Sequence, residues 1–226
     1  MANNSYTVRL IDCAGSSGGV DSNTTAVGAS LTAWYRSVCQ QATSGDTTWT
    51  ADVQWQTQPG GNSSGQDAGN PIAINLIIFF VQSPRESVIK LHPQFRTITL
   101  PAENDTGIWG TTVGRFTPPG AAVGHRTPTL GISEVYVSRC RDTANATTQL
   151  NLARMGFHES MHNQLIRVGD ELHRGNGDFA ADTPTGTAPS APNLQMMAAA
   201  IGILVPQWPD GFQAWRNKAN DPLGGF

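Results

Sequence analysis

Two histidines and a glutamate stand close together in the segment His158-Glu159-Ser160-Met161-His162. On a helix, residues four apart project from the same face, so the imidazoles of His158 and His162 can bind one metal ion. Histidine nitrogen is a common ligand of Zn²⁺. Glu159 lies on the flank of that face, where its carboxylate can take a proton from a zinc-bound water without being a ligand. We therefore expect His158 and His162 to be zinc ligands and Glu159 to be the catalytic base.

A catalytic zinc site needs a third protein ligand and keeps one position open. Gly169 is a natural left-handed end for the motif helix, so the chain can reverse there and return His173 to the metal. Asp170 is the alternative third ligand. We favour His173 because neutral imidazole is the common third donor in such sites.

Hydrophobic periodicity predicts the elements that must position these residues. Strands are expected over 6–13, 48–56, 71–82 and 131–138, with an amphipathic helix over 24–42. The uninterrupted apolar run within 71–82 indicates a strand that is covered on both faces. The motif helix should begin near Ala146 and bury one apolar ridge, which comprises Leu150, Ala153, Phe157, Met161 and Leu165.

The order of these elements predicts one domain over 1–226, with a sheet-containing part over 1–141 and the motif helix and C-terminal part over 142–226. We expect an α+β or α/β fold, in which a mixed twisted sheet packs on two main helices and the second carries the motif. Residues 174–193 are rich in Gly, Asp, Thr, Pro and Ala and are expected to be loop. A short final helix is expected over 196–204.

The motif helix resembles that of the zincin metallopeptidases, and its setting is similar to the metzincin branch of that family. The resemblance implies a mixed sheet before the helix, a glycine turn (Gly169) that delivers a third ligand, and a methionine-containing turn under the zinc at Met196 or Met197. The sequence departs from the longer metzincin signature, because Leu165 and Val168 stand where that signature has glycine and the third ligand.

The same resemblance implies a peptide or protein substrate in an extended conformation. The strand 132–137 would be the sheet edge along which that peptide pairs. Peptide hydrolysis also needs a donor that stabilises the oxyanion of the tetrahedral intermediate. Tyr136 and Arg174 are the candidates for this role. Strand packing is the favoured explanation of Tyr136, whereas a solvated loop position explains Arg174 equally well.

Composition narrows the classes of partner. Only 14% of the residues are charged, the formal net charge is −3, and lysine occurs only at Lys90 and Lys218. Without a Lys/Arg block, a nucleic-acid partner is not expected. The N-terminus lacks the features of a classical signal peptide, and the longest apolar run is about half of a membrane span. We expect a soluble protein that is cytoplasmic or exported by a non-classical route, with no membrane partner.

Cys13, Cys39 and Cys140 form no CxxC pair, and buried thiols are the simpler interpretation, with one disulfide as the alternative. Together these features predict a zinc metallopeptidase (a metalloendopeptidase) whose zinc-bound water is activated by Glu159. The alternative is a non-catalytic or narrowly specific protein, either an exported or injected effector or a virion-type binding module with a structural zinc site.

Overall fold

The computed structural model describes residues 2–14, 24–42, 47–57, 66–67, 75–83, 87–90, 97–100, 109–116, 130–140, 148–165, 173, 179 and 184–202. Its elements in chain order are β1 (Ala2–Asp12), α1 (Thr24–Gln41), β2 (Thr47–Thr57), β3 (Gln66–Asp67), β4 (Leu76–Val81), β5 (Ser87–Lys90), β6 (Thr97–Leu100), β7 (Gly110–Phe116), β8 (Leu130–Tyr136), α2 (Thr148–Leu165) and α4 (Ala191–Gly202). Within these ranges, every helix is too short or too polar to cross a bilayer.

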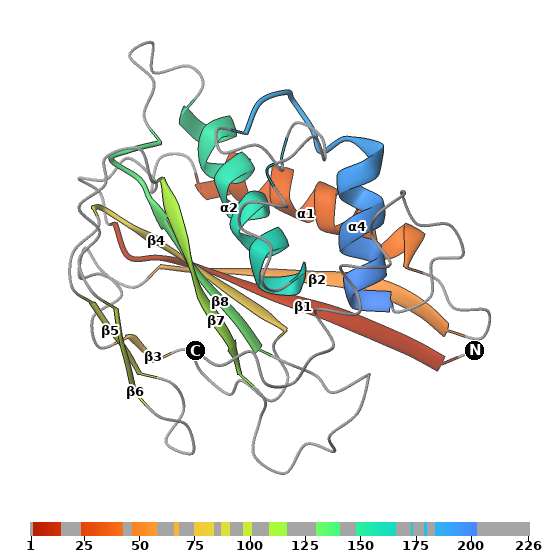
Figure 1. Cartoon of the computed structure of the whole chain (residues 1–226), viewed down its shortest axis with the longest axis horizontal. Helices are drawn as coiled ribbons and strands as arrows, with labels where there is room; N and C mark the ends of the chain where they lie inside the picture. The colour runs from red at the N-terminus through yellow and green to blue at the C-terminus, as the bar shows by residue number, and fades with distance from the viewer. Residues whose placement is uncertain are drawn as a thin grey trace.

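The main sheet has five strands in the order β2-β1-β4-β8-β7. Its first four strands are parallel, and β7 runs antiparallel to β8 (Figure 1). Parallel neighbours need a crossover connection, which α1 provides between β1 and β2. Strands β3, β5 and β6 form a separate small sheet. The expected mixed sheet with helices is therefore confirmed at the level of an α+β fold.

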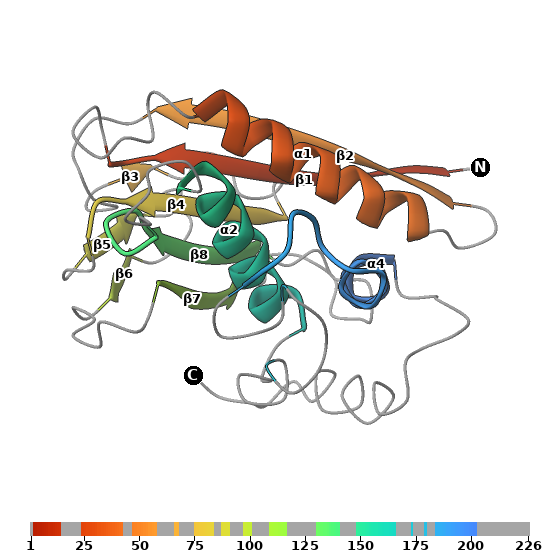
Figure 2. The same cartoon turned by 90° about the horizontal axis from the view of Figure 1, so that it is seen from above.

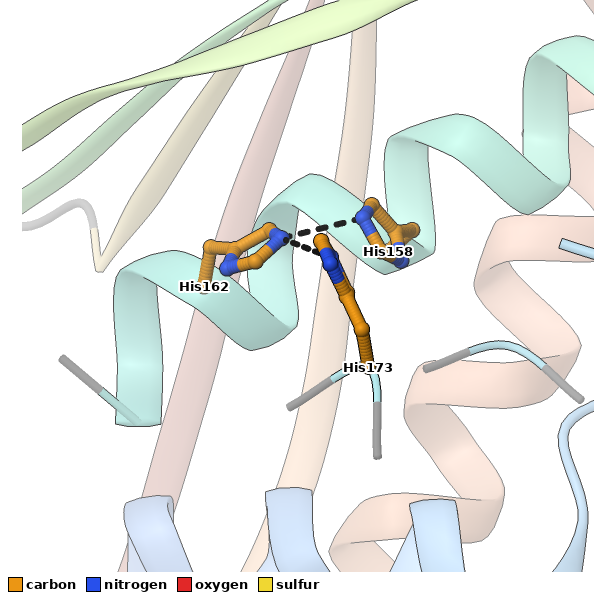
Figure 3. A group of neighbouring side chains, drawn as sticks. All are labelled: His158, His162 and His173. Atoms are coloured by element: carbon orange, nitrogen blue, oxygen red, sulfur yellow. Dashed lines mark hydrogen bonds between the residues drawn. The ribbon is translucent and has the colours of Figure 1, made fainter. Parts of the chain in front are cut away.

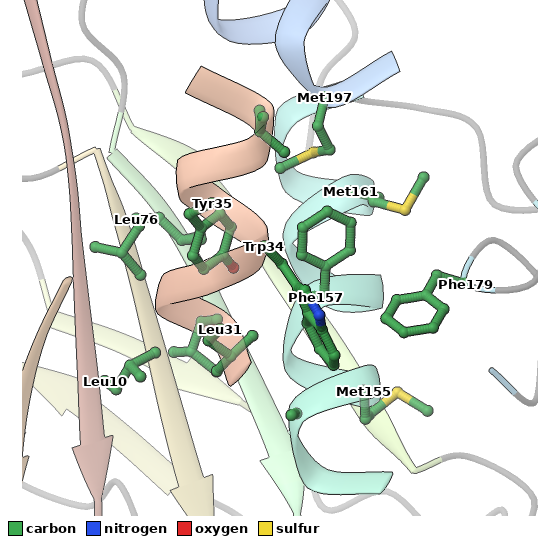
Figure 4. Close-up of a cluster of buried hydrophobic side chains, with 14 of the residues drawn as sticks. Leu10, Leu31, Trp34, Tyr35, Leu76, Met155, Phe157, Met161, Phe179 and Met197 are labelled. Carbon is green, nitrogen blue, oxygen red and sulfur yellow. The ribbon is translucent and has the colours of Figure 1, made fainter. Parts of the chain in front are cut away.

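Helices α1, α2 and α4 lie on one face of the main sheet, as the two perpendicular views show (Figures 1 and 2). Helix α1 packs on β2, α2 packs on β7 and β8, and α4 packs on α1 and α2. The apolar ridge expected for α2 is confirmed at Ala153, Phe157 and Met161, which are fully buried. The ring of Phe157 packs edge-on against Trp34 of α1 at a centroid distance of 6.0 Å and lies tilted against Tyr35 at 5.5 Å (Figure 4). This aromatic contact fixes α2 against α1.

Strand β4 is buried along its whole length, as its apolar run predicts. Leu76, Ile78 and Phe80 join the core beneath the helices. Ile77 and Phe79 alternate with them and are fully buried on the opposite face. Both faces of the sheet centre are therefore covered.

Two sequence-based expectations about the elements are wrong. Strand β8, expected at the sheet edge, is an inner strand because β7 pairs along its outer side. Helix α4 begins at Ala191 rather than 196, because Ser190 accepts the first helical hydrogen bond from the amide of Leu194. Pro192 is compatible with this early start, since a proline in the first turn of a helix loses no hydrogen bond.

Candidate metal centre

Helix α2 places His158 and His162 one turn apart, and the chain brings His173 back beside them (Figure 3). The Nε2 atom of His162 lies 3.0 Å from that of His158 and 3.2 Å from that of His173. His158 and His173 stack with a ring-centroid distance of 5.3 Å. The predicted third histidine therefore joins the other two, and the group could hold a metal ion.

The spacing of these nitrogens can be compared with what a tetrahedral zinc ion requires. With Zn–N bonds of about 2.0–2.1 Å, two ligand nitrogens on a tetrahedral ion lie about 3.3 Å apart. The two Nε2 separations at His162 are within a few tenths of an ångström of that value. Three imidazoles also match the common ligand set of a catalytic zinc site. The residues present thus fit the ion.

The three histidines differ in their access to solvent. His158 is 3% exposed, whereas His162 and His173 are partly exposed, so the group opens toward solvent on their side. Burial, together with the neighbouring His158 and His173, lowers the pKa of His162 to about 3. His162 is therefore neutral at physiological pH, which is the form that binds a metal.

Glu159 is buried on the side of α2 that faces β7 and β8. The hydroxyl of Thr112 on β7 donates to the Glu159 carboxylate, with Oγ1 and Oε2 separated by 3.0 Å. Thr112 and Ser133 of β8 each place their hydroxyl 3.2 Å from the backbone oxygen of Glu159. Burial raises the pKa of Glu159 to about 8, and the hydrogen bond from Thr112 acts in the opposite direction.

Small residues on β7 and β8 allow α2 to approach the sheet this closely. A Cβ atom at Gly110 would meet Glu159, and one at Gly131 would lie 3.1 Å from Gln164 and 3.2 Å from Asn163. The side-chain amide of Asn163 donates to the hydroxyl of Ser133. Sequence reasoning missed Gly110, because its role depends on which strand lies beneath the helix.

The structure also bears on Tyr136, one of the two candidates for stabilising the oxyanion. Gly131 and Ser133 of β8 face α2. Tyr136 lies an even number of residues from Ile132 on the same strand, so these two side chains share the other face of the sheet. Because side chains alternate along a strand, Tyr136 points to the face away from α2, which removes the support for its oxyanion role. Gly169, Asp170 and Arg174 lie outside the described residues.

Met196 and Met197 are buried within α4, so these two residues do not form the expected methionine-containing turn. Both belong to the core cluster under the helices, where their unbranched side chains fill space. Their apolar neighbours Ala198 and Ile201 continue the buried face of the helix. Two features favour a helix here: the N-terminal cap at Ser190 and the buried apolar face of the residues that follow it.

All three cysteines are buried free thiols, as the simpler interpretation predicted. Burial raises the pKa of Cys13 and of Cys39 to about 12 in each case, and it also raises the pKa of Cys140. Thiols held in this protonated form are poor metal ligands. The histidine group is therefore the candidate metal centre.

Comparison of the chain with family models, with curated proteins and with solved structures returns no match. The residues of the site and their geometry are therefore the basis for assigning a function.

Proposed function

We propose that this chain is a zinc-dependent peptidase of zincin-like type, in which His158, His162 and His173 hold the ion and Glu159 is the general base. The observation that carries the proposal is the convergence of three histidine Nε2 atoms, two of them on the helix that also carries the buried Glu159. A three-histidine set leaves a fourth position open on a tetrahedral ion, which is typical of catalytic rather than structural zinc sites.

When bound, a zinc ion supplies a Lewis acid that acidifies water, polarises a carbonyl and favours the carboxylate form of a nearby glutamate. Glu159 then takes a proton from the attacking water onto its carboxylate and passes it to the leaving amine. The hydroxyl of Thr112 holds one carboxylate oxygen of Glu159, so the base has a defined orientation. Partial exposure of His162 and His173 provides the side from which substrate can approach.

A peptide substrate is supported by the position of β7. This strand forms one end of the sheet order, so its outer edge is unpaired among the described strands. It also carries Thr112, which contacts the proposed base. An extended peptide that pairs with this edge by main-chain hydrogen bonds would lie next to β7, the strand that contacts Glu159.

Metal analysis combined with a broad peptide-library digest tests the proposal. The wild type should contain close to one zinc per chain and cleave peptides. His162→Ala should lose the metal, and Glu159→Gln should keep the metal but lose activity by at least about 100-fold, as expected for a general base. Asp52→Asn is a matched control, because it removes a carboxylate at an exposed position of β2.

The outcomes separate the proposal from its alternatives. A wild-type protein that takes up no zinc would overturn both the metal site and the peptidase activity. Stoichiometric zinc without cleavage of any peptide would contradict the peptidase activity and favour a structural or binding role for the metal. Activity that survives in Glu159→Gln would remove Glu159 from the role of base.

A further inference from the structure

The buried ligand His158 makes a second polar contact on the side away from the other histidines. Its Nδ1 atom lies 2.7 Å from the backbone oxygen of Phe179. A carbonyl oxygen has no proton to give, so Nδ1 must carry the hydrogen and donate it. In neutral His158, Nε2 is then the unprotonated nitrogen, and this is the atom that lies 3.0 Å from His162. The contact with Phe179 therefore selects the tautomer that a metal needs.

Phe179 is itself held from several sides. Its ring is fully buried and packs edge-on against Trp34 and Phe157, at centroid distances of 5.0 and 5.8 Å. Its backbone amide donates to the side-chain Oδ1 of Asn193 over 3.1 Å. Hydrogen bonds thus fix the carbonyl of Phe179 to α2 and its amide to α4.

Asn193 belongs to the cap at the start of α4. The hydroxyl of Ser190 lies 3.1 Å from the same Oδ1 atom of Asn193, and the backbone oxygen of Ser190 accepts from the amide of Leu194. Asn193 is fully buried, so its oxygen has a defined position. Ser190 and Asn193 are three residues apart at the start of α4, and the hydrogen bond between their side chains helps to hold this Oδ1 in place.

We propose that Ser190 and Asn193 are positioning residues of the metal centre. Asn193 holds the amide of Phe179, the carbonyl of Phe179 holds Nδ1 of His158, and His158 thereby presents a bare, oriented Nε2 to the ion. This inference depends on the metal-binding part of the proposed function, but not on peptidase activity. Mutation of residues that hydrogen-bond to a metal ligand commonly weakens metal affinity by about 10- to 100-fold.

Zinc affinity, measured by competition with a chromogenic chelator, tests the proposal. Asn193→Ala should weaken zinc binding by about 10- to 100-fold. Asn193→Asp keeps an acceptor oxygen at the same place and should bind zinc within about threefold of wild type, because the outer contact is retained. Leu194→Ala is the matched control: it truncates a partly buried side chain of α4 without touching the amide of Phe179. Its zinc affinity should stay at the wild-type value even where its Tm falls.

A second measurement needs no metal. Side-chain ¹⁵N NMR of the metal-free protein should show His158 with its proton on Nδ1 in the wild type and in Leu194→Ala. Asn193→Ala should show a mixture of the two tautomers. Unchanged zinc affinity in Asn193→Ala, or equal losses in Asn193→Ala and Leu194→Ala, would overturn the proposal. Wild-type protein that binds zinc tightly but cleaves no peptide would instead contradict the peptidase function and leave this inference standing.

Discussion

Gly110 of β7 lies directly against the carboxylate of Glu159. A Cβ atom built on Gly110 would lie 2.7 Å from Oε1 and 2.8 Å from Cγ of Glu159, and 2.9 Å from the backbone oxygen of Glu134. The last of these atoms belongs to the paired neighbour strand β8 and cannot move aside. The position beneath the proposed base therefore has room for glycine only.

Gly110→Ala should displace the Glu159 side chain without removing any metal ligand. We expect kcat for peptide cleavage to fall by about 10- to 100-fold, because a misplacement of about 1 Å at a reacting group has an effect of that size. Zinc content should remain close to that of the wild type. Steady-state kinetics together with metal analysis measures both quantities.

Gly28→Ala provides the control for a glycine replacement on another element. A Cβ atom there would meet only Cε3 of Trp55, at the ordinary contact distance of 3.8 Å. This variant should keep wild-type kcat. Full activity in Gly110→Ala would show that the carboxylate of Glu159 is not held where catalysis needs it.

Thr112→Val should remove the hydrogen bond to the Glu159 carboxylate while keeping the shape of the side chain. That hydrogen bond lowers the pKa of Glu159, so its loss should raise that pKa further. A general base works only when deprotonated, so the acid limb of the pH–rate profile should move to higher pH. We expect kcat near neutral pH to fall by about 10-fold, less than the roughly 100-fold or greater loss on removing a general base, because Glu159 itself is kept.

Thr112→Ser keeps the hydroxyl and should restore both the rate and the position of the acid limb. The pH dependence of kcat/KM for the three proteins measures the shift. Equal losses in the valine and serine variants would contradict this role of the hydrogen bond, because serine keeps the hydroxyl that makes it.

The stability of the metal-free protein should depend on pH through His162 and Glu159 in opposite senses. The pKa of His162 is lowered from 6.5 to about 3, so in that range the unfolded chain binds a proton that the folded chain does not. This contribution to stability is lost as the pH falls. The pKa of Glu159 is raised from 4.5 to about 8, so its contribution is lost as the pH rises through that range.

The two contributions oppose each other between pH 4.5 and 6.5, where they should leave a plateau of stability. Urea unfolding of the metal-free protein, measured from pH 3 to pH 8, should show losses on both sides of that plateau. In Glu159→Gln the loss on the alkaline side should disappear. A wild-type stability that rises between pH 6.5 and 8 would contradict the proposed protonation of buried Glu159.

Gly156→Ala should stabilise α2, two residues before the first histidine. A Cβ atom there would make ordinary contacts with Leu31 at 3.4 Å and Phe80 at 3.5 Å. Replacing glycine by alanine inside a helix stabilises it by about 0.5–1 kcal/mol. For a chain of this size we expect Tm to rise by about 1–4 °C in differential scanning calorimetry. A lower Tm would show that the core between α1 and β4 has no room for one methyl group.

Local pattern was enough to predict the helix that carries the motif and the burial of β4. Phe157 and Met161 recur at helical spacing and are buried as expected. The start of α4 was missed because Pro192 and the polar residues before it have the composition of a loop. Ser190, directly followed by Ala191 and Pro192, indicates the true start, since serine is favoured at the N-cap and proline in the first turn of a helix.

Local sequence is enough to place His158, Glu159 and His162 on one helix, because a helical period of 3.6 residues is a local property of the backbone. The folded chain brings His173, which the sequence favours over Asp170, beside His162, and it places β7 beside Glu159. Thr112 and Glu159 are 47 residues apart, and Phe179 and Asn193 are 14 apart. Contacts of this kind depend on how the sheet and helices pack together, and the residues adjacent in sequence do not specify that packing.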